Sequence, residues 1–410
     1  MRQIVLINVS GTDKPGVTSS IMEILSRDGT QILDIGQAVI HETLSLGILV
    51  EVPADAQSSP LLKDVLFRTH ELGLQARFTP IDEASYAAWV AGQGKPRHIV
   101  TLLARRLSSR HLAAISAVIC RFGLNIDRIE RLSGRIPLGE LSGASRACVE
   151  MSARGALEDA AALRRELLQI AVAMEVDIAY QEDNIFRRNR RLVAFDMDST
   201  LIDAEVIDEL AKAAGVGEQV AAITERAMAG ELDFTESFRA RVALLKGLDQ
   251  SVLEQVAQNL RLNEGAEKLI AIMRKLGYKT AILSGGFTYF GRYLQDRLGI
   301  DYVYANELEI ADGKVTGAVT GTVVDGRRKA ELLMELAVRE NIALDQVIAV
   351  GDGANDLPML SIAGLGIAFR AKPIVKQSAK QSISTLGLDG ILYLLGYSDR
   401  ETSLTTDRPA

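Results

Sequence analysis

Hydrophobic and polar positions change their spacing several times along the chain, and the first 82 residues form one complete pattern. Residues 3–9 (QIVLINV) have the apolar character of a strand, and apolar side chains from Val17 to Leu25 recur at helical spacing. Gly29 follows as a helix stop. We predict strands at 3–9, 31–39, 43–52 and 74–79, and helices at 17–28 and 60–74. This order, βαββαβ, is typical of a ferredoxin-like fold.

The same order of elements recurs after residues 80–96, which contain Gly and Pro and read as a linker with a short helix around Trp89. This second pattern predicts strands at 97–104, 125–133, 144–153 and 174–180, and helices at 109–122 and 155–172. The two patterns make a weak internal repeat of roughly 95 residues, visible in the element order more than in residue identity.

The pattern changes again after residues 181–191 (QEDNIFRRNRR), which are polar and basic. Short apolar runs now alternate with long helical patterns, which predicts a doubly wound parallel sheet. Its strands are expected at 192–195, 278–283, 347–350 and 365–369. Residues 203–262 contain several helical runs and no good strand, so we expect a helical insertion there. The polar tail from Asp399 to Ala410 lacks an apolar period and is predicted to be disordered.

Charge and cysteine content restrict the possible functions. The formal net charge of −7 argues against a nucleic-acid or membrane-surface role, which would need a basic face. No apolar stretch reaches the ~18 residues of a transmembrane helix. Cys120 and Cys148 are the only cysteines, and they cannot build a disulfide framework or a cysteine-based zinc site. We therefore expect a cytoplasmic protein in a reducing compartment.

Two carboxylates stand directly after the first predicted strand of the parallel sheet, in Asp196-Met197-Asp198-Ser199-Thr200. Ligands of open parallel sheets gather at the carboxyl ends of the strands. Taken alone, an Asp-x-Asp pair is a common turn or helix-cap sequence. The strand before it and the Ser-Thr after it favour a functional site.

Three further segments lie in comparable places. Asp352 and Asp356 follow the apolar run 347–350, where their carboxylates can bind Mg²⁺ together with Asp196. Ser284-Gly285-Gly286 ends another apolar run, and its hydroxyl and backbone amides can bind a phosphate. Lys329 begins a helical pattern and alone would be read as a surface lysine. Glycine, Asp and Asn are also turn formers, so each segment by itself has an ordinary explanation.

In their order along the chain, the four segments resemble the motifs of haloacid-dehalogenase-type phosphatases. Their amino-acid sequences are more similar still to those of the phosphoserine phosphatases. The resemblance covers about residues 190–396. It implies that Asp196 is the nucleophile of an aspartyl-phosphate intermediate and that Asp198 is the proton donor and acceptor. It also implies Mg²⁺ on Asp196, Asp352 and the backbone carbonyl of Asp198, with Asp356 orienting metal ligands or water. The groups expected at the phosphate are Ser284, Gly285, Gly286, Lys329 and Asn355.

The helical insertion extends this resemblance, because phosphoserine phosphatases place a Glu, a Met, a Phe and an Arg around the substrate there. The matching positions are Glu205, Met228, Phe234 and Arg241. Glu205 would bind the substrate ammonium and Arg241 its carboxylate. The implied activity is Mg²⁺-dependent hydrolysis of O-phospho-L-serine to L-serine and phosphate, the last step of serine biosynthesis. The insertion is expected to act as a lid.

The N-terminal half resembles a tandem pair of ACT domains, which often bind amino acids. Asp13-Lys14-Pro15-Gly16-Val17 resembles their first-loop motif, which implies a regulatory ligand such as L-serine at Asp13 and Gly16. The second repeat has Arg106-Leu107-Ser108-Ser109-Arg110 at this place and lacks the Pro-Gly. Regulation and simple dimerisation both stay open as roles. Edge-to-edge pairing of these modules favours a homodimer.

The sequence thus predicts an α/β chain with ACT-like domains at 1–82 and 97–181 and a haloacid-dehalogenase-like domain at 190–396, whose helical cap spans about 203–262. The sequence leaves two alternative functions open. One is hydrolysis of another small phosphomonoester or of a phosphoprotein. The other is an amino-acid-sensing binding protein with a degenerate enzyme half, against which the joint presence of the motif residues argues.

Overall fold

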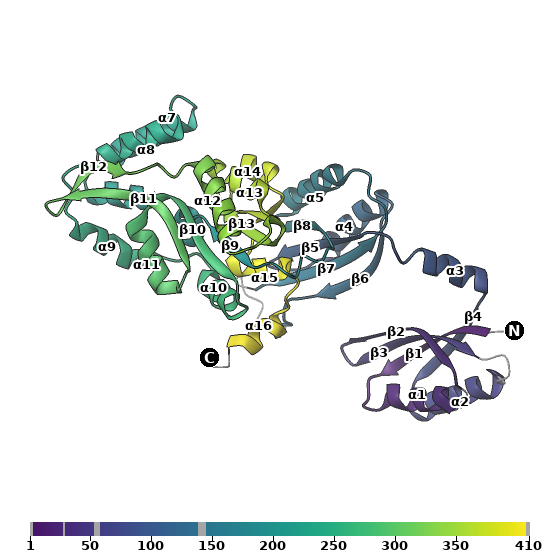
Figure 1. The fold of residues 1–410 in the computed structure, drawn as a ribbon. Helices are drawn as coiled ribbons and strands as arrows, with labels where there is room; N and C mark the ends of the chain where they lie inside the picture. Colours follow the sequence, from purple (N-terminus) through teal and green to yellow (C-terminus); the bar gives the residue numbers. More distant parts are fainter. Residues whose placement is uncertain (1–2, 28, 53–57, 138–144, 407–410) are drawn as a thin grey trace. The chain divides into compact units, whose positions relative to one another are not determined.

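The computed structural model describes residues 3–27, 29–52, 58–137 and 145–406 (Figure 1). The chain divides into two compact units, Met1–Lys95 and Pro96–Ala410.

The described part of the N-terminal unit contains one four-stranded antiparallel sheet with two helices, followed by a third helix in the linker. The sheet has the strand order β2-β3-β1-β4. Its elements are β1 (Gln3–Thr12), α1 (Val17–Arg27), β2 (Gln31–Ile40), β3 (Thr43–Val52), α2 (Ser58–Glu71) and β4 (Gln75–Ile81). The predicted βαββαβ order is confirmed, although residue 28 of the first predicted helix lies outside the described residues. The short helix of the linker is α3 (Glu83–Ala91).

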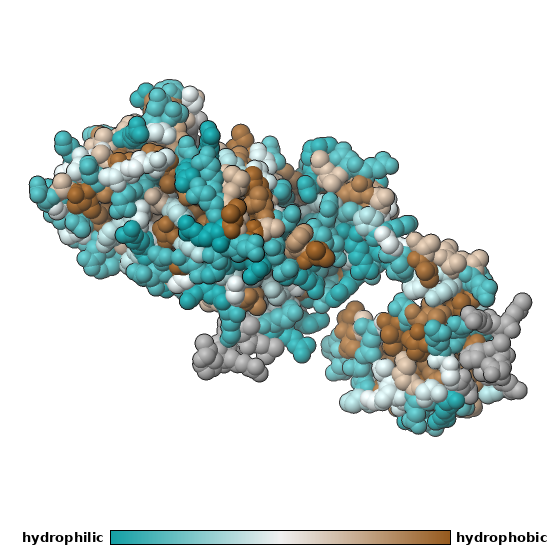
Figure 2. Space-filling view, in the orientation of Figure 1, coloured by the Kyte–Doolittle hydropathy of each residue, from teal (hydrophilic) through white to brown (hydrophobic). Residues whose placement is uncertain are grey.

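Strand β2 forms an open edge of this sheet. Its side chains are largely exposed, including Ile35 at 49% and Ile40 at 74%. Figure 2 shows hydrophobic side chains at the surface of this unit where its strands lie. Unpaired backbone groups and apolar side chains on an edge strand favour pairing with another chain.

The second unit begins with a sheet that repeats the first. Its strand order, β6-β7-β5-β8, is the order of the first sheet shifted by one repeat. Its elements are β5 (Arg97–Ala104), α4 (Ser109–Arg121), β6 (Asn125–Arg131), β7 (Ala147–Arg154), α5 (Ala160–Met174) and β8 (Asp177–Glu182). This confirms the repeat inferred from element order. The predicted start of β7 at residue 144 lies outside the described residues.

A seven-stranded sheet makes up the remaining core, in the order β12-β11-β10-β9-β13-β14-β15. Its strands are β9 (Leu192–Phe195), β10 (Lys279–Phe287), β11 (Tyr302–Ala311), β12 (Lys314–Thr320), β13 (Val347–Gly351), β14 (Leu365–Phe369) and β15 (Gln381–Ile383). Among these described strands, only β11 and β12 pair antiparallel. The doubly wound parallel sheet is therefore confirmed, with an antiparallel extension that the pattern did not predict.

The helices of this domain fall into an insertion and a set that covers the sheet. The insertion after β9 consists of α6 (Val206–Ala213), α7 (Gly217–Met228), α8 (Phe234–Ala243) and α9 (Ser251–Asn259), which confirms the predicted helical segment. The other helices are α10 (Ala266–Lys275), α11 (Thr288–Leu298), α12 (Gly326–Arg339), α13 (Leu357–Ile362), α14 (Pro373–Ser378) and α15 (Ile391–Leu394). None of the helices in the described part of the chain is long and apolar enough to cross a membrane.

The prediction of a disordered tail is wrong for its first eight residues, which form helix α16 (Asp399–Thr406). Polar contacts stabilise this helix in place of an apolar face. Asp399 accepts hydrogen bonds from the Tyr393 hydroxyl at 2.8 Å and the Gly134 amide at 2.7 Å. Thr402 is buried. Residues 407–410 lie outside the described residues.

Strand β9 is buried along its whole length, because the parallel sheet is covered on both faces. Val193 and Phe195 belong to one hydrophobic cluster, and Leu192 and Ala194 to another. The first cluster also contains Leu103 of β5. The second ACT-like sheet therefore shares a core with the domain that carries the candidate site.

Candidate active site

Neighbouring parallel strands bring the predicted motif residues to one edge of the sheet. Phe195 of β9 is in register with Val350 of β13 and with Ile282 of β10. The backbone amide of Asp196 donates to the Val350 carbonyl at 2.8 Å, which continues this pairing to the strand end. Asp196 therefore emerges beside the turn that follows β13 and the Ser-Gly-Gly segment of β10.

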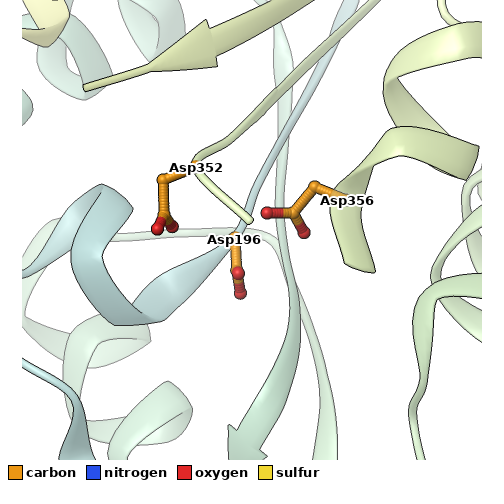
Figure 3. Close-up of side chains that lie close together, drawn as sticks. All are labelled: Asp196, Asp352 and Asp356. Atoms are coloured by element: carbon orange, nitrogen blue, oxygen red, sulfur yellow. The ribbon is translucent and has the colours of Figure 1, made fainter. Parts of the chain in front are cut away.

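Three carboxylates meet at this edge (Figure 3). Oxygens of Asp196, Asp352 and Asp356 all lie within 4.8 Å of one another, and two of the three residues are buried. Asp352 Oδ1 accepts a hydrogen bond from the Thr200 hydroxyl at 3.0 Å. Burial, followed by the charge of Asp196, raises the pKa of Asp352 to about 7. Clustered hard oxygens that raise each other's pKa fit a divalent cation.

Lys329 places a positive charge beneath this cluster from the first turn of α12. Its Nζ lies 2.9 Å from Asp196 Oδ2 and 2.7 Å from Asp356 Oδ1, and the side chain is fully buried. Burial opposes the charge, yet Asp196 and Asp356 together raise the pKa of Lys329 above its ordinary value. The other Asp356 oxygen accepts the Gly353 amide at 2.9 Å. Both carboxylate oxygens of Asp356 thus have hydrogen-bond partners within the protein, which suits a residue that orients its neighbours.

The carboxyl group of Asp198 has other neighbours than the three clustered carboxylates. Its Oδ1 accepts the Val206 amide at 3.0 Å. Burial first, then the charges of Glu205 and Asp196, raise the pKa of Asp198 well above its usual range. A carboxyl group with a raised pKa is better suited to act as a general acid. The carboxylate cluster above does not include Asp198.

The glycines after Ser284 are required by close approach. A methyl group on Gly286 would lie 2.5 Å from Asp198 Oδ2, and one on Gly285 would lie 2.8 Å from the Phe234 ring. The Gly286 amide donates to Ser284 Oγ at 2.9 Å, so the turn is compact. Glycine at position 286 therefore leaves room for the Asp198 carboxyl group.

Most of the predicted residues share one cavity of about 760 Å³. The predicted residues that line it are Asp196, Asp198, Glu205, Phe234, Arg241, Gly285, Gly286, Asp352 and Asn355. Ser284, Lys329 and Asp356 are buried beneath this surface. The side chain of Met228, the remaining predicted substrate contact, lies outside the described part of the chain. Asp13 and Gly16, the predicted regulatory residues, line a separate cavity in the N-terminal unit.

The opposite charges of Glu205 and Arg241 both belong to this cavity. Glu205 Oε1 accepts the Ser199 hydroxyl at 2.7 Å, and burial raises the pKa of Glu205. Burial lowers the pKa of Arg241, while Glu205 acts in the other direction. An acid and a guanidinium held in one cavity can bind the ammonium and the carboxylate of an amino acid.

Two buried asparagines support the site and were not predicted. Asn306 donates to the Gly285 carbonyl at 2.8 Å and accepts the Val324 amide at 2.8 Å. Asn263 donates to the carbonyl of Thr200 at 2.9 Å. These contacts join residues far apart in sequence, so the local pattern holds no signal for them. Lys372, which also lines the cavity, was likewise not predicted.

The raised pKa of Asp352 predicts the pH dependence of stability in the metal-free protein. The folded state holds this proton up to about pH 7, whereas the unfolded chain releases it near pH 3.9. Stability from this group is therefore full at low pH and is lost as pH rises towards 7. The free energy of unfolding can be measured by denaturation in chelator at pH 5 and at pH 8. Between these two pH values it should fall by about 1–2 kcal/mol more in the parent than in Asp352→Asn. Equal pH slopes in the two proteins would contradict this assignment.

Family models match three segments of the chain. ACT-domain models match residues 3–79 and 96–181, and a haloacid dehalogenase-like hydrolase model matches residues 193–361. A phosphoserine phosphatase of Streptomyces coelicolor is 41% identical over 396 residues, 97% of this chain and 93% of the relative. A phosphoserine phosphatase of Mycobacterium tuberculosis is 40% identical and covers 97% of this chain and 94% of its own length.

The chain belongs to the phosphoserine phosphatase family. A solved structure agrees with this membership. A probable phosphoserine phosphatase of Vibrio cholerae, in an unliganded form, superimposes with a TM-score of 0.58 at 36% identity, covering 76% of this chain and 89% of that one. The chain is thus a haloacid-dehalogenase-type hydrolase preceded by two ACT domains.

Proposed function

We propose that this phosphoserine phosphatase family member hydrolyses O-phospho-L-serine to L-serine and phosphate, using Asp196 as the nucleophile and Mg²⁺ as the cofactor. One observation carries the proposal beyond family membership. The cavity that contains Asp196 and Asp198 also contains Glu205 and Arg241. A small amino acid that carries a phosphate would meet complementary groups for each of its three charged groups there.

Asp196, Asp352 and the backbone carbonyl of Asp198 would hold the Mg²⁺, since they offer the oxygen ligands that this ion prefers. When bound, the ion would neutralise charge between the carboxylates and the phosphate. Lys329 adds a fixed positive charge 2.9 Å from Asp196 Oδ2. Ser284 and the amides of Gly285 and Gly286 would hold the phosphoryl oxygens, which requires the Gly286 amide to leave its 2.9 Å hydrogen bond with Ser284 Oγ.

The two carboxyl groups of the Asp-x-Asp pair divide the reaction. An oxygen of Asp196 attacks phosphorus, and the bond from phosphorus to the serine oxygen breaks. Asp198 gives its proton to the leaving serine oxygen, which its raised pKa allows. Asp198 then takes a proton from water, whose oxygen attacks phosphorus and releases Asp196 and phosphate. The insertion that carries Glu205 and Arg241 would close over the site as a lid.

Arg241→Ala tests the carboxylate contact. We expect kcat/KM for O-phospho-L-serine to fall by about 10²-fold, because the variant leaves a substrate carboxylate unpaired in the cavity. O-phosphoethanolamine lacks that carboxylate, so its turnover should change by less than about threefold. Arg239→Ala, an exposed arginine on the same helix, is the matched control. Equal losses for the two substrates would place Arg241 outside the carboxylate site.

We further propose that the first ACT domain binds L-serine. Asp13 and Gly16 line a cavity of about 430 Å³ together with Thr18 and Gln37, whose side chains hydrogen bond at 3.0 Å. Calorimetry on the full chain should detect L-serine binding that Asp13→Ala weakens by about tenfold, while Asp34→Ala, on the neighbouring strand β2, does not. No heat with the parent, together with no effect of L-serine on turnover, would favour a purely structural role.

The same domain supports a homodimer as the assembled form. Strand β2 leaves a long edge with exposed Ile35 and Ile40, and a second copy can continue the sheet there. The proposed enzyme would then act as a cytoplasmic homodimer in serine biosynthesis.

A further inference from the structure

The loop that carries the catalytic pair adopts a conformation that needs support. Ser199 has a φ of 55°, in the left-handed region that a non-glycine residue adopts only at an energetic disadvantage. Its hydroxyl also positions Glu205, at 2.7 Å. Any group that holds this loop therefore affects both the reacting carboxyls and the substrate contact.

Asn263 provides that support from the segment before α10. Its side-chain Nδ2 lies 3.2 Å from the Ser199 carbonyl, 2.9 Å from that of Thr200 and 3.1 Å from that of Ile202. Its backbone amide donates to the Leu201 carbonyl at 2.9 Å. Asn263 is 5% exposed, so these contacts are shielded from bulk solvent. One amide group thus gathers the carbonyls of the turn around Ser199.

The orientation of the Asn263 amide is fixed from its other side. Arg370 donates from Nη1 to Asn263 Oδ1 at 3.0 Å and from Nη2 to Glu264 Oε2 at 3.2 Å. An arginine on the oxygen keeps the NH₂ group turned towards the loop.

The chain of contacts ends on the second ACT domain. Arg105, directly after β5, donates to both oxygens of Glu264, at 3.0 Å and 2.6 Å. The hydrogen bond from Arg105 is the largest influence that lowers the pKa of Glu264, ahead of the charge of Arg370. This bidentate pairing fixes the position of the Glu264 carboxylate, and the carboxylate in turn fixes the position of the Arg370 guanidinium.

Resting on the proposed function, we propose that Arg105 is a positioning residue for the reaction. Through Glu264 and Arg370 it fixes the Asn263 amide on the loop 199–202, so the second ACT domain biases the geometry of the catalytic pair. The ion pairs are partly exposed, with side-chain exposures of 28%, 36% and 41% for Arg105, Arg370 and Glu264. The coupling is therefore modest, and the loop also has hydrogen bonds outside this chain of contacts, such as that from the Thr200 hydroxyl to Asp352 at 3.0 Å.

The test is a set of substitutions in the full chain, measured as kcat and KM for O-phospho-L-serine. Asn263→Ala should lower kcat at least about tenfold, because it removes several buried hydrogen bonds from the loop. Arg105→Ala should lower kcat about fivefold with KM within twofold, and Arg105→Lys should restore part of it. In the Asn263→Ala background, Arg105→Ala should have no further effect.

Arg297→Ala is the matched control, since it removes a partly exposed ion pair with Glu267 that does not contact the loop. Its kcat should match that of the parent. Three results would overturn the relay. The first is a parent-like kcat in Arg105→Ala. The second is a loss of kcat in the double variant that equals the sum of the two single losses on a free-energy scale. The third is a loss of kcat in Arg297→Ala as large as that in Arg105→Ala. The same variants assayed with p-nitrophenyl phosphate keep the test valid if the parent does not turn over O-phospho-L-serine, which would refute the proposed function alone.

Discussion

Replacing Asp196 by asparagine is expected to lower the rate of phosphate release at least about 10⁴-fold. The neutral amide is not a nucleophile that can attack phosphorus, so no phosphorylated enzyme intermediate forms. Asparagine has nearly the same shape, so it can still fill the position beside Lys329 and the Met197 amide, which donates to Asp196 Oδ1 at 2.7 Å. The protein should therefore stay folded. Phosphate release at saturating substrate and Mg²⁺, with circular dichroism on the same samples, measures both effects.

Asp203→Asn is the control for this variant. Asp203 follows the same loop, is exposed and does not line the cavity. It should retain activity within about twofold of the parent. Activity of Asp196→Asn above about one per cent of the parent would remove Asp196 from the nucleophile role.

Replacing Lys329 by methionine is expected to affect both activity and stability. Loss of its charge beside Asp196 should lower kcat about 10³-fold, as with other fixed charges at a reacting group. It also leaves Asp196 and Asp356 buried without their counter-charge, which should lower the free energy of unfolding by about 3–5 kcal/mol at pH 8. Denaturant unfolding and steady-state kinetics measure the two effects.

The stability loss of Lys329→Met should shrink at pH 5. Burial, followed by the charge of Asp196, raises the pKa of Asp356 to about 7, so Asp356 is protonated at pH 5 and no longer repels the buried Asp196. Lys314→Met, at an exposed lysine of β12, should be neutral in both assays. A Lys329→Met protein with parent-like kcat would show that the lysine charge does not serve the reaction.

The sequence predicted the site where order along the chain implies proximity in space. Asp196, Asp352 and the Ser284 turn each end a buried strand, and parallel strands bring their carboxyl ends to one edge. Lys329 is different, because nothing local distinguishes it from a surface lysine. Only the family order of the motifs identified it, and burial between two carboxylates explains why it is there.

The missed features depend on contacts that a local pattern does not encode. Asn263 donates to backbone carbonyls of the loop around Ser199, more than 60 residues earlier in the chain. Arg370 donates to the side-chain oxygen of Asn263 across more than 100 residues. Helix α16 lacks an apolar period and is held by polar contacts, so its composition resembled a disordered tail. The β11–β12 hairpin is an exception, because its signal is local. Asp312-Gly313 is a dipeptide that two-residue hairpin turns favour, and both residues have positive φ in the structure.

We propose that Asp196 and its neighbours hydrolyse O-phospho-L-serine with Mg²⁺. The most direct measurement is phosphate release by the purified full chain from a panel of small phosphomonoesters and a phosphopeptide, with Mg²⁺ and with chelator. We predict that O-phospho-L-serine has the highest kcat/KM of the panel, and that both chelator and Asp196→Asn abolish its turnover. Preference for a different substrate, or turnover of O-phospho-L-serine that persists in chelator or in Asp196→Asn, would contradict the account.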